Sequence, residues 1–198
     1  MFRVLLLSTP VVFLLVSCAT NPKGRIMGDE EEGYVGTREA GASTFDRLIE
    51  STVSRLLERF QNEHPTDGVR RVAFLSLENK TSEPLGAFHD QITELVDTSI
   101  NNSRVFRSIS LRFVEAALRE TRLRRDDLFI PAHQRTFAEV LERHGQPVQS
   151  ILFGVLTSGT TRGDGVRQVD YMLTLELVDI TTGDSQKDSV RLRKAYVR

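Results

Sequence analysis

Val-Arg-Arg-Val-Ala-Phe-Leu-Ser-Leu, residues 69–77, is the stretch that decides the fold of this chain. Its second half, residues 72–77, is almost continuously apolar, which is typical of a β-strand buried on both faces inside a sheet. The strand leads into the polar residues 78–82, where Asn and Thr side chains can hydrogen-bond neighbouring backbone groups. The sequence therefore predicts an interior strand followed by a polar loop.

Amphipathic helices are expected before and after this strand. Between residues 45 and 60, apolar residues recur at steps of three and four with charged residues on the opposite side, and His64-Pro65 ends the pattern. A second apolar stripe runs from Phe88 to about Asn101. Both patterns predict helices that pack against a sheet.

A short strand and a third helix follow. Residues 105–109 predict the strand, and Ser110 suits the N-cap of a helix that ends in the basic stretch 119–125. Residues 126–131 are expected to be a connection.

A capping box predicts one more helix. Thr136 is followed three residues later by Glu139, a spacing at which both side chains can bond the free N–H groups of a helix start. Gly145 is the expected C-terminal stop of this short helix.

The C-terminal part of the chain is predicted to form strands. Residues 148–158 are apolar and β-branched, and residues 169–180 alternate between apolar and polar. A loop is expected at 159–166 and a turn at 181–184, before a last strand over 185–198. The element order predicts an α+β fold with a mixed sheet of about four to five strands, including a C-terminal antiparallel meander, packed against three to four helices.

The N-terminus has the pattern of an export signal with a lipid-attachment cysteine. Arg3 precedes an apolar run that is too short to span a bilayer. The motif Leu-Val-Ser-Cys at residues 15–18 resembles the lipobox of bacterial lipoproteins, which predicts a signal peptide over 1–17 and diacylation of Cys18. Cys18 is the only cysteine, and the alternative is a free or buried thiol. By resemblance to the sorting rule of enteric bacteria, Ala19 in place of Asp favours the outer membrane.

Glycines and an acidic run give residues 18–43 the composition of a flexible linker. A coil of roughly 25 residues has an r.m.s. reach of about 25–30 Å, and its extended length is at most about 80–90 Å. A single globular domain is therefore predicted over residues 44–198, held near the membrane by its lipid anchor.

Charge and motif spacing argue against several classes of function. The net charge of −1 leaves no basic excess for nucleic acid. The four histidines show no metal-ligand spacing and no nucleophile elbow is present, so no enzyme, metal, cofactor or small-molecule substrate is predicted. The glycine-rich residues 159–165 lack the lysine of a phosphate-binding loop and precede a strand, which favours a hairpin loop.

A cluster of arginines after the third predicted helix could meet an acidic partner surface. The cluster consists of Arg119, Arg122, Arg124 and Arg125. The alternative is that these charges are favourable at a helix C-terminus and are neutralised by Asp126-Asp127. The sequence alone leaves both interpretations open.

From about residue 69 to residue 193 the chain resembles LpoB, a family of lipoprotein activators of penicillin-binding proteins. The resemblance rests on the buried strand before Glu-Asn-Lys-Thr at 78–81, the strand at 104–108 and the Leu-Val-Asp-Ile-Thr-Thr-Gly turn at 177–183. A strand followed by Asn-x-Thr also occurs in proteins with the fold of the TolB N-terminal domain and in the curli-secretion lipoprotein CsgG.

The resemblance implies a TolB-like fold and a non-enzymatic regulator, anchored in the outer membrane and facing the periplasm. Its implied partner is a class A penicillin-binding protein, which is a peptidoglycan synthase. We expect the docking surface around Asn79, Lys80 and Thr81 and around the arginine cluster. The alternative is an envelope assembly or secretion scaffold of the CsgG or TolB type.

Overall fold

The computed structural model describes residues 42–63, 65, 68–163 and 166–197. The predicted signal peptide, Cys18 and most of the predicted linker lie outside these residues. The elements along the chain are α1 (Ala42–Glu63), β1 (Arg70–Lys80), α2 (Ala87–Asn102), β2 (Phe106–Ser108), α3 (Leu111–Thr121), the 3-10 helix η1 (Arg125–Phe129), α4 (Pro131–Arg143), β3 (Ser150–Gly163), β4 (Val166–Asp179) and β5 (Ser185–Val197).

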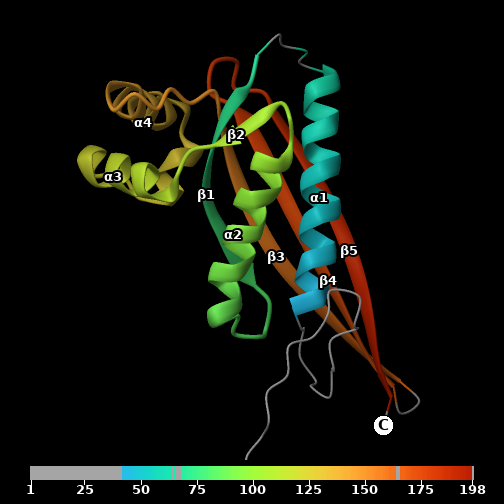
Figure 1. Ribbon diagram of the computed structural model, residues 1–198. Coiled ribbons are helices and arrows are strands. Elements are labelled where there is room, and N and C mark those ends of the chain that lie inside the picture. The colour runs from blue at the N-terminus through green and yellow to red at the C-terminus, as the bar shows by residue number, and fades with distance from the viewer. Residues whose placement is uncertain (1–41, 64, 66–67, 164–165, 198) are drawn as a thin grey trace, which may run out of the picture. The chain divides into compact units, whose positions relative to one another are not determined.

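The five strands form one mixed sheet in the order β2-β1-β3-β4-β5. β1 runs parallel to both of its neighbours, β2 and β3, whereas β3, β4 and β5 are joined as an antiparallel meander. Figure 1 shows α1 and α2 in front of the sheet, and α3 and α4 together beyond its β1 side. The predicted α+β fold with a mixed sheet and a C-terminal meander is confirmed.

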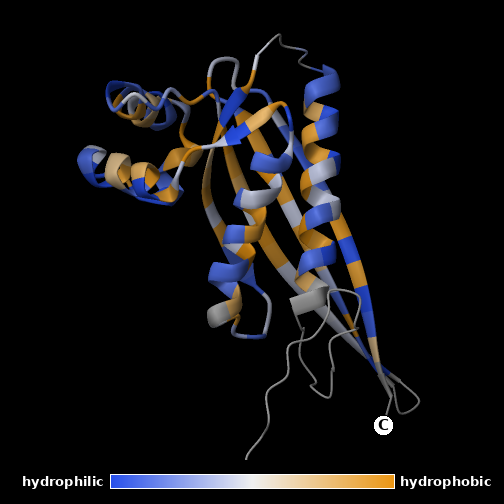
Figure 2. Ribbon diagram, in the orientation of Figure 1, coloured by the Kyte–Doolittle hydropathy of each residue, from blue (hydrophilic) through white to orange (hydrophobic). Residues whose placement is uncertain are grey.

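The sheet separates two hydrophobic cores. Residues of α1 and α2 pack on one face of the sheet, and residues of α3, η1 and α4 pack on the other. In Figure 2, α1, α2 and β5 each carry both hydrophobic and hydrophilic residues along their length. The hydrophobic residues of the two helices belong to the core that they share with the sheet. Five alternate residues of β4 are fully buried in the core under α1 and α2, as the alternation predicts; they are Val169, Tyr171, Leu173, Leu175 and Leu177.

β1 contributes side chains to both cores, which is why its sequence is an almost unbroken apolar run. Phe74 and Leu77 belong to the core under α1 and α2, and Ala73 and Leu75 belong to the core under α3 and α4. Strict alternation would place residues 74 and 77 on opposite faces. The register between β1 and β3 shifts between Phe74 and Ser76, and this β-bulge restores Leu77 to the face of Phe74.

The turn between β4 and β5 is fixed to the start of β1 through the buried carboxylate of Asp179. One oxygen, Oδ1, accepts hydrogen bonds from the backbone N–H groups of Thr181 at 2.8 Å and Thr182 at 3.1 Å. The other oxygen, Oδ2, accepts a hydrogen bond from Nη1 of Arg70 at 2.9 Å. The guanidinium carbon of Arg70 also lies 5.1 Å from the ring centroid of Phe60 at the end of α1. Three elements therefore meet at one ion pair.

The predicted loop at 159–166 is wrong for residues 159–163 and 166; residues 164–165 lie outside the described residues. β3 continues to Gly163 and pairs with β4 from Val166 onward, with Thr160 opposite Val169. β-branched threonines suit a strand, so the strand extends through residues 159–163, where the glycines predicted a loop.

The predicted capping box at Thr136 is also wrong. α4 begins at Pro131, whose fixed φ and missing N–H suit the first position of a helix. The Thr136 hydroxyl, inside the helix, donates to the carbonyl of Ala132 at 3.2 Å. The predicted connection at 126–131 instead contains η1 and the first residue of α4. Gly145, with φ +71°, follows the helix and its N–H donates to Glu142 at 2.8 Å, which confirms the predicted stop.

Gly154 is the position in β3 at which a side chain would disturb the packing most directly. A Cβ atom there would lie 3.0 Å from Leu77 Cδ1 and 3.2 Å from Leu175 Cδ2. We expect Gly154→Val to lower the free energy of unfolding by about 1–3 kcal/mol, because the larger side chain overpacks the core. Gly159 lies in the same strand, and a Cβ atom added there would meet nothing within 4 Å, so Gly159→Val is the control. Urea unfolding of both variants tests this, and equal stabilities would contradict it.

Candidate partner-binding surfaces

The loop after β1 is held by its own side chains. Asn79 Oδ1 accepts hydrogen bonds from the backbone N–H of Thr81 at 3.0 Å and from its hydroxyl group at 2.7 Å. Asn79 Nδ2 donates to the carbonyl of Glu83 at 2.9 Å, and the N–H of Glu83 donates to Thr81 Oγ1 at 3.2 Å. The Asn-x-Thr motif thus builds the loop, because both polar side chains are engaged within it.

Lys80, the last residue of β1, is exposed to solvent beside this loop. Its side chain is 55% exposed, and its Nζ lies 3.0 Å from Glu78 Oε2. A surface ion pair of this kind contributes little to stability, so Lys80 remains available to a partner. Of the three residues predicted here, Lys80 offers the most accessible charge.

Glu83 connects the loop to the sheet. Its two carboxylate oxygens each lie 2.9 Å from the hydroxyl of Tyr171, a fully buried residue of β4. At the far end of the loop, α2 begins, and the ring centroids of Phe45 and Phe88 lie 5.9 Å apart. The loop is therefore anchored beside the starts of both α1 and α2.

The arginine cluster lies around the end of α3. Arg119 is in the last turn, Arg122 is the C-cap residue in the left-handed conformation with φ 58°, and Arg124 and Arg125 begin η1. Arg119 Nη1 lies 3.8 Å and Arg125 Nη2 lies 3.5 Å from the carboxylate of Glu115. Arg119 is 73% exposed, so its pairing is weak and its charge faces solvent.

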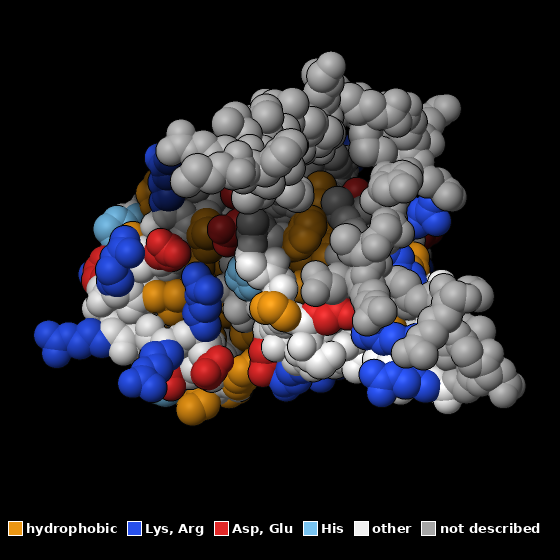
Figure 3. Space-filling model, turned by 90° about the horizontal axis from the view of Figure 1, so that it is seen from below, with side chains coloured by type: hydrophobic (Ala, Val, Ile, Leu, Met, Phe, Trp, Pro, Cys, Tyr) orange, Lys and Arg blue, Asp and Glu red, His pale blue; other side chains and the backbone are white. Residues whose placement is uncertain are grey.

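The sequence left open the alternative that Asp126 and Asp127 neutralise the arginine cluster, but the structure gives Asp127 another role. Asp127 Oδ2 accepts a hydrogen bond from the backbone N–H of Arg124 at 2.7 Å, so this carboxylate caps η1. The carboxylate that lies between arginines is Glu115, one turn before Arg119. Figure 3, seen from below, shows Lys and Arg side chains on the left-hand part of the molecule interspersed with acidic ones.

The two predicted surfaces do not converge. Figure 1 shows the loop between β1 and α2 at the lower end of the sheet and the end of α3 far to the left, beside α4. A single small partner surface would contact one of them. The structure thus separates the residues predicted from sequence into two candidate surfaces.

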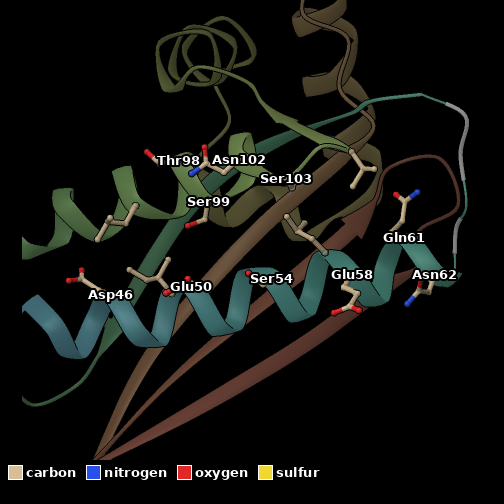
Figure 4. A pocket seen from close by; sticks show the side chains of 14 residues that line it. Asp46, Glu50, Ser54, Glu58, Gln61, Asn62, Thr98, Ser99, Asn102 and Ser103 are labelled. Atoms are coloured by element: carbon tan, nitrogen blue, oxygen red, sulfur yellow. The ribbon is translucent and has the colours of Figure 1, made fainter. Parts of the chain in front are cut away.

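A groove between α1 and α2 is a third surface, and the sequence patterns did not predict it. Its volume is about 600 Å³. Figure 4 shows polar side chains from both helices along its length. They include Asp46, Glu50, Ser54, Glu58 and Gln61 of α1 and Thr98, Ser99 and Asn102 of α2. The sequence contained a signal for the acidic side of this groove, because Asp46, Glu50 and Glu58 of α1 are four and eight residues apart. The pattern did not show that α2 lies beside them.

The described histidines are engaged in local hydrogen bonds. His89 Nε2 lies 3.1 Å from the carbonyl oxygen of Leu77, and His133 Nδ1 lies 3.0 Å from that of Asp127. His144 Nε2 lies 2.8 Å from a carboxylate oxygen of Glu120. That hydrogen bond, with the charges of Arg143 and His144, outweighs desolvation and lowers the pKa of Glu120. Within the described ranges, no group of three His, Cys, Asp or Glu residues could hold a metal ion.

The described residues thus form an α+β domain with exposed charged side chains and an open groove between two helices. None of the helices described here carries an apolar stretch of the length that a membrane crossing requires. Residues 43–185 match the family model described as peptidoglycan-synthase activator LpoB, and the chain belongs to this family. The family resemblance carried by the strand, loop and turn motifs is confirmed.

Solved structures with a similar arrangement share little sequence with this chain. The LpoB C-terminal domain from Salmonella enterica is 19% identical with a TM-score of 0.48, over 74% of this chain and 97% of that one. The same domain from Escherichia coli is 17% identical, with the same TM-score and coverage. Lipoprotein GNA1162 from Neisseria meningitidis is 13% identical with a TM-score of 0.44, over 64% of this chain and 83% of that one. No curated protein sequence matches the chain.

Proposed function

We propose that this chain is a lipoprotein of the outer membrane that faces the periplasm, binds a class A penicillin-binding protein and activates its peptidoglycan synthesis. The observation that carries the proposal is membership of the peptidoglycan-synthase activator family over residues 43–185. The lipobox at residues 15–18 supports the membrane anchor. Two acyl chains on Cys18 would give stable attachment, where one gives only reversible binding.

In this proposal the protein acts by binding and not by catalysis. A regulator shifts its partner toward the active state only by as much as its affinity differs between the active and inactive states. The domain would therefore contact a part of the synthase that changes between these states. The linker, with an r.m.s. reach of about 25–30 Å, would limit how far from the membrane this contact occurs.

Two of the surfaces described above present exposed positive charge suited to an acidic partner. Lys80 lies at the end of β1, and Arg119, Arg122 and Arg124 lie at and after the end of α3. Complementary charge raises the association rate and excludes partners of like charge. Because these surfaces are apart, they can be tested separately.

Reconstitution tests the proposed function. The full-length protein in detergent micelles is mixed with a class A synthase from the same bacterium, and the rate of glycan polymerisation from lipid-linked precursor is measured. We expect a complex and a several-fold increase in rate. A synthase that neither binds the protein nor changes its rate would contradict the proposal.

Removing positive charge at the end of α3 tests whether the arginine cluster binds the synthase. We expect Arg119→Gln, Arg122→Asn and Arg124→Gln together to weaken synthase binding by about tenfold, mostly through slower association. Asn is used at 122 because it tolerates the left-handed backbone there.

The matched control removes the same amount of charge elsewhere. Arg104, Arg135 and Arg191 are exposed and lie outside both predicted surfaces, and their replacement by Gln should leave binding unchanged. Lys80→Glu reports on the loop surface in the same assay. If the control triple weakens binding as much as the α3 triple, the effect is general electrostatics and the α3 surface is not the docking site.

A further inference from the structure

The polar side of α1 carries three acidic residues toward α2, which form its acidic flank, and two arginines toward β5, which form its basic flank. Asp46, Glu50 and Glu58 lie at multiples of four residues along the helix and line the groove beside α2. On the flank toward β5, Arg55 Nε lies 3.0 Å and Arg59 Nη2 lies 3.7 Å from the buried carboxylate of Asp188. The basic flank is therefore used inside the fold, whereas the acidic flank faces an open groove.

The groove holds acidic side chains without cations. None of the described residues that line it is Lys, Arg or His, and no ion pair among the described residues includes Asp46, Glu50 or Glu58. Burial raises the pKa of Asp46, so its charged form is partly desolvated without compensation. The Gln61 Oε1 atom is also buried and has no donor among the described residues. Every one of these groups would be stabilised by a donor or a positive charge from outside the domain.

The base of the groove is apolar. Ile49 and Leu57 of α1, Leu95 of α2 and Val105 line it below the acidic residues. Leu95 is 36% exposed. The groove thus has an apolar strip with negative charge along one side. An amphipathic segment with an apolar stripe and adjoining positive residues is complementary to this surface.

The backbone chemistry of the groove selects a helix as the occupant. Its walls are α1 and α2, whose backbone groups are hydrogen-bonded within each helix, so they offer no partners to an extended strand. A helix satisfies its own backbone groups and can bury one apolar face. Its rise of about 1.5 Å per residue also matches the four-residue spacing of the acids on α1.

We propose that the groove between α1 and α2 is a docking site for a cationic amphipathic helix of a protein partner. The apolar stripe of that helix contacts Leu95 and Leu57, and Lys or Arg residues at four-residue steps pair with Asp46, Glu50 and Glu58. The site is separate from Lys80 and from the arginine cluster, and the inference does not depend on the proposed activation of a synthase.

A designed peptide tests the site directly. The probe is a fluorescein-labelled 18-residue peptide of Leu, Ala and Lys, with Leu in an apolar stripe and Lys at four-residue steps along one edge. The first control peptide carries Glu in place of Lys, and the second has the same composition in an order that is not amphipathic as a helix. Binding to the full-length protein in neutral detergent is followed by fluorescence anisotropy at about 0.15 M salt. We expect the probe alone of the three peptides to bind.

Charge-neutral variants locate the binding. We expect Asp46→Asn, Glu50→Gln and Glu58→Gln together to weaken probe binding by about tenfold, because three ion pairs at exposed residues are lost. The matched control is Asp126→Asn, Glu139→Gln and Glu142→Gln, which makes the same change in net charge at exposed residues outside the groove. This control triple should bind the probe as the unchanged protein does.

A pair of apolar variants tests the base of the groove. Leu95→Ala should weaken probe binding several-fold, whereas Leu111→Ala, at a residue of similar exposure on α3, should not. Circular dichroism confirms that each variant is folded. The inference is overturned if the probe does not bind, if the Glu peptide or the non-amphipathic peptide binds as tightly, or if the groove and control variants lose affinity equally.

Discussion

We expect Asp179→Ala to lower the free energy of unfolding by about 2–3 kcal/mol, because it leaves a largely buried arginine side chain and two backbone N–H groups without their acceptor. The lost interactions are those with Arg70, Thr181 and Thr182. Arg70 is only 15% exposed in its side chain, so water replaces the carboxylate poorly. Asp179→Asn keeps an acceptor for the backbone groups but loses the charge, and its effect should be intermediate.

The pH dependence of stability gives an independent check on Asp179. Burial alone would raise the pKa of this carboxyl, but the hydrogen bonds from Thr182, Arg70 and Thr181 and the charge of Arg70 outweigh burial and lower the pKa below its usual 3.8. Because this pKa is lowered in the folded state, the ionised carboxylate of Asp179 stabilises the fold. Its contribution to the free energy of unfolding is fully present above the unfolded-state pKa and is lost as the pH falls through the folded-state pKa. The difference in the free energy of unfolding between the unchanged protein and Asp179→Ala should therefore be constant above about pH 5 and should shrink below about pH 4.

Asp184→Ala is the matched control for this turn. Asp184 is exposed and lies in the same turn between β4 and β5. Its replacement should change the free energy of unfolding by less than about 0.5 kcal/mol. Urea unfolding at several pH values measures all three variants. Equal destabilisation by Asp179→Ala and Asp184→Ala would show that the ion pair with Arg70 is not what stabilises the turn.

Cys18→Ala should remove the protein from the outer membrane. Each acyl chain contributes about 0.8 kcal/mol per buried CH2, so two chains account for nearly all of the predicted membrane affinity. The full chain is produced with its own signal sequence in an enteric host, labelled with palmitate, and fractionated on a density gradient. We expect the acyl label and the outer-membrane pool to disappear together.

Ser17→Ala is the control for this prediction, because it keeps a small residue before the cysteine. It should be labelled and sorted as the unchanged protein is. If Cys18→Ala still fractionates with the outer membrane, another feature of the chain anchors the protein.

The sequence predicted the elements best where a hydrophobic period is long. The helical period of residues 45–60 and the alternation of residues 169–177 each predicted which side chains are buried, and those side chains are buried in the structure. These predictions succeed because side-chain direction follows directly from backbone geometry. Where local signals competed, tertiary pairing decided the outcome. The glycines of residues 159–163 predicted a loop, but pairing with β4 extends the strand through them.

The candidate surfaces were harder to predict than the fold. The sequence predicted a polar loop over residues 78–82, but β1 continues to Lys80, so Asn79 pairs with β3 and, of the three residues predicted to bind a partner here, only Thr81 lies beyond the strand. The hydrogen bonds of Asn79 and Thr81 turn inward and leave Lys80 as the accessible charge. The acidic flank of α1 is visible in the sequence as a stripe, yet a groove exists only because α2 lies alongside it. That arrangement depends on contacts between residues far apart in the chain, which periodicity does not encode.

The position of α1 has a mechanical consequence. If the proposed lipid anchor at Cys18 is pulled, the load reaches the described residues at Ala42, the first residue of α1. The helix is held along its length by the core beneath it and by the ion pairs of its Arg55 and Arg59 with Asp188 of β5, so these contacts would share such a load. The element that receives the pull is thus the one best placed to spread it over the sheet.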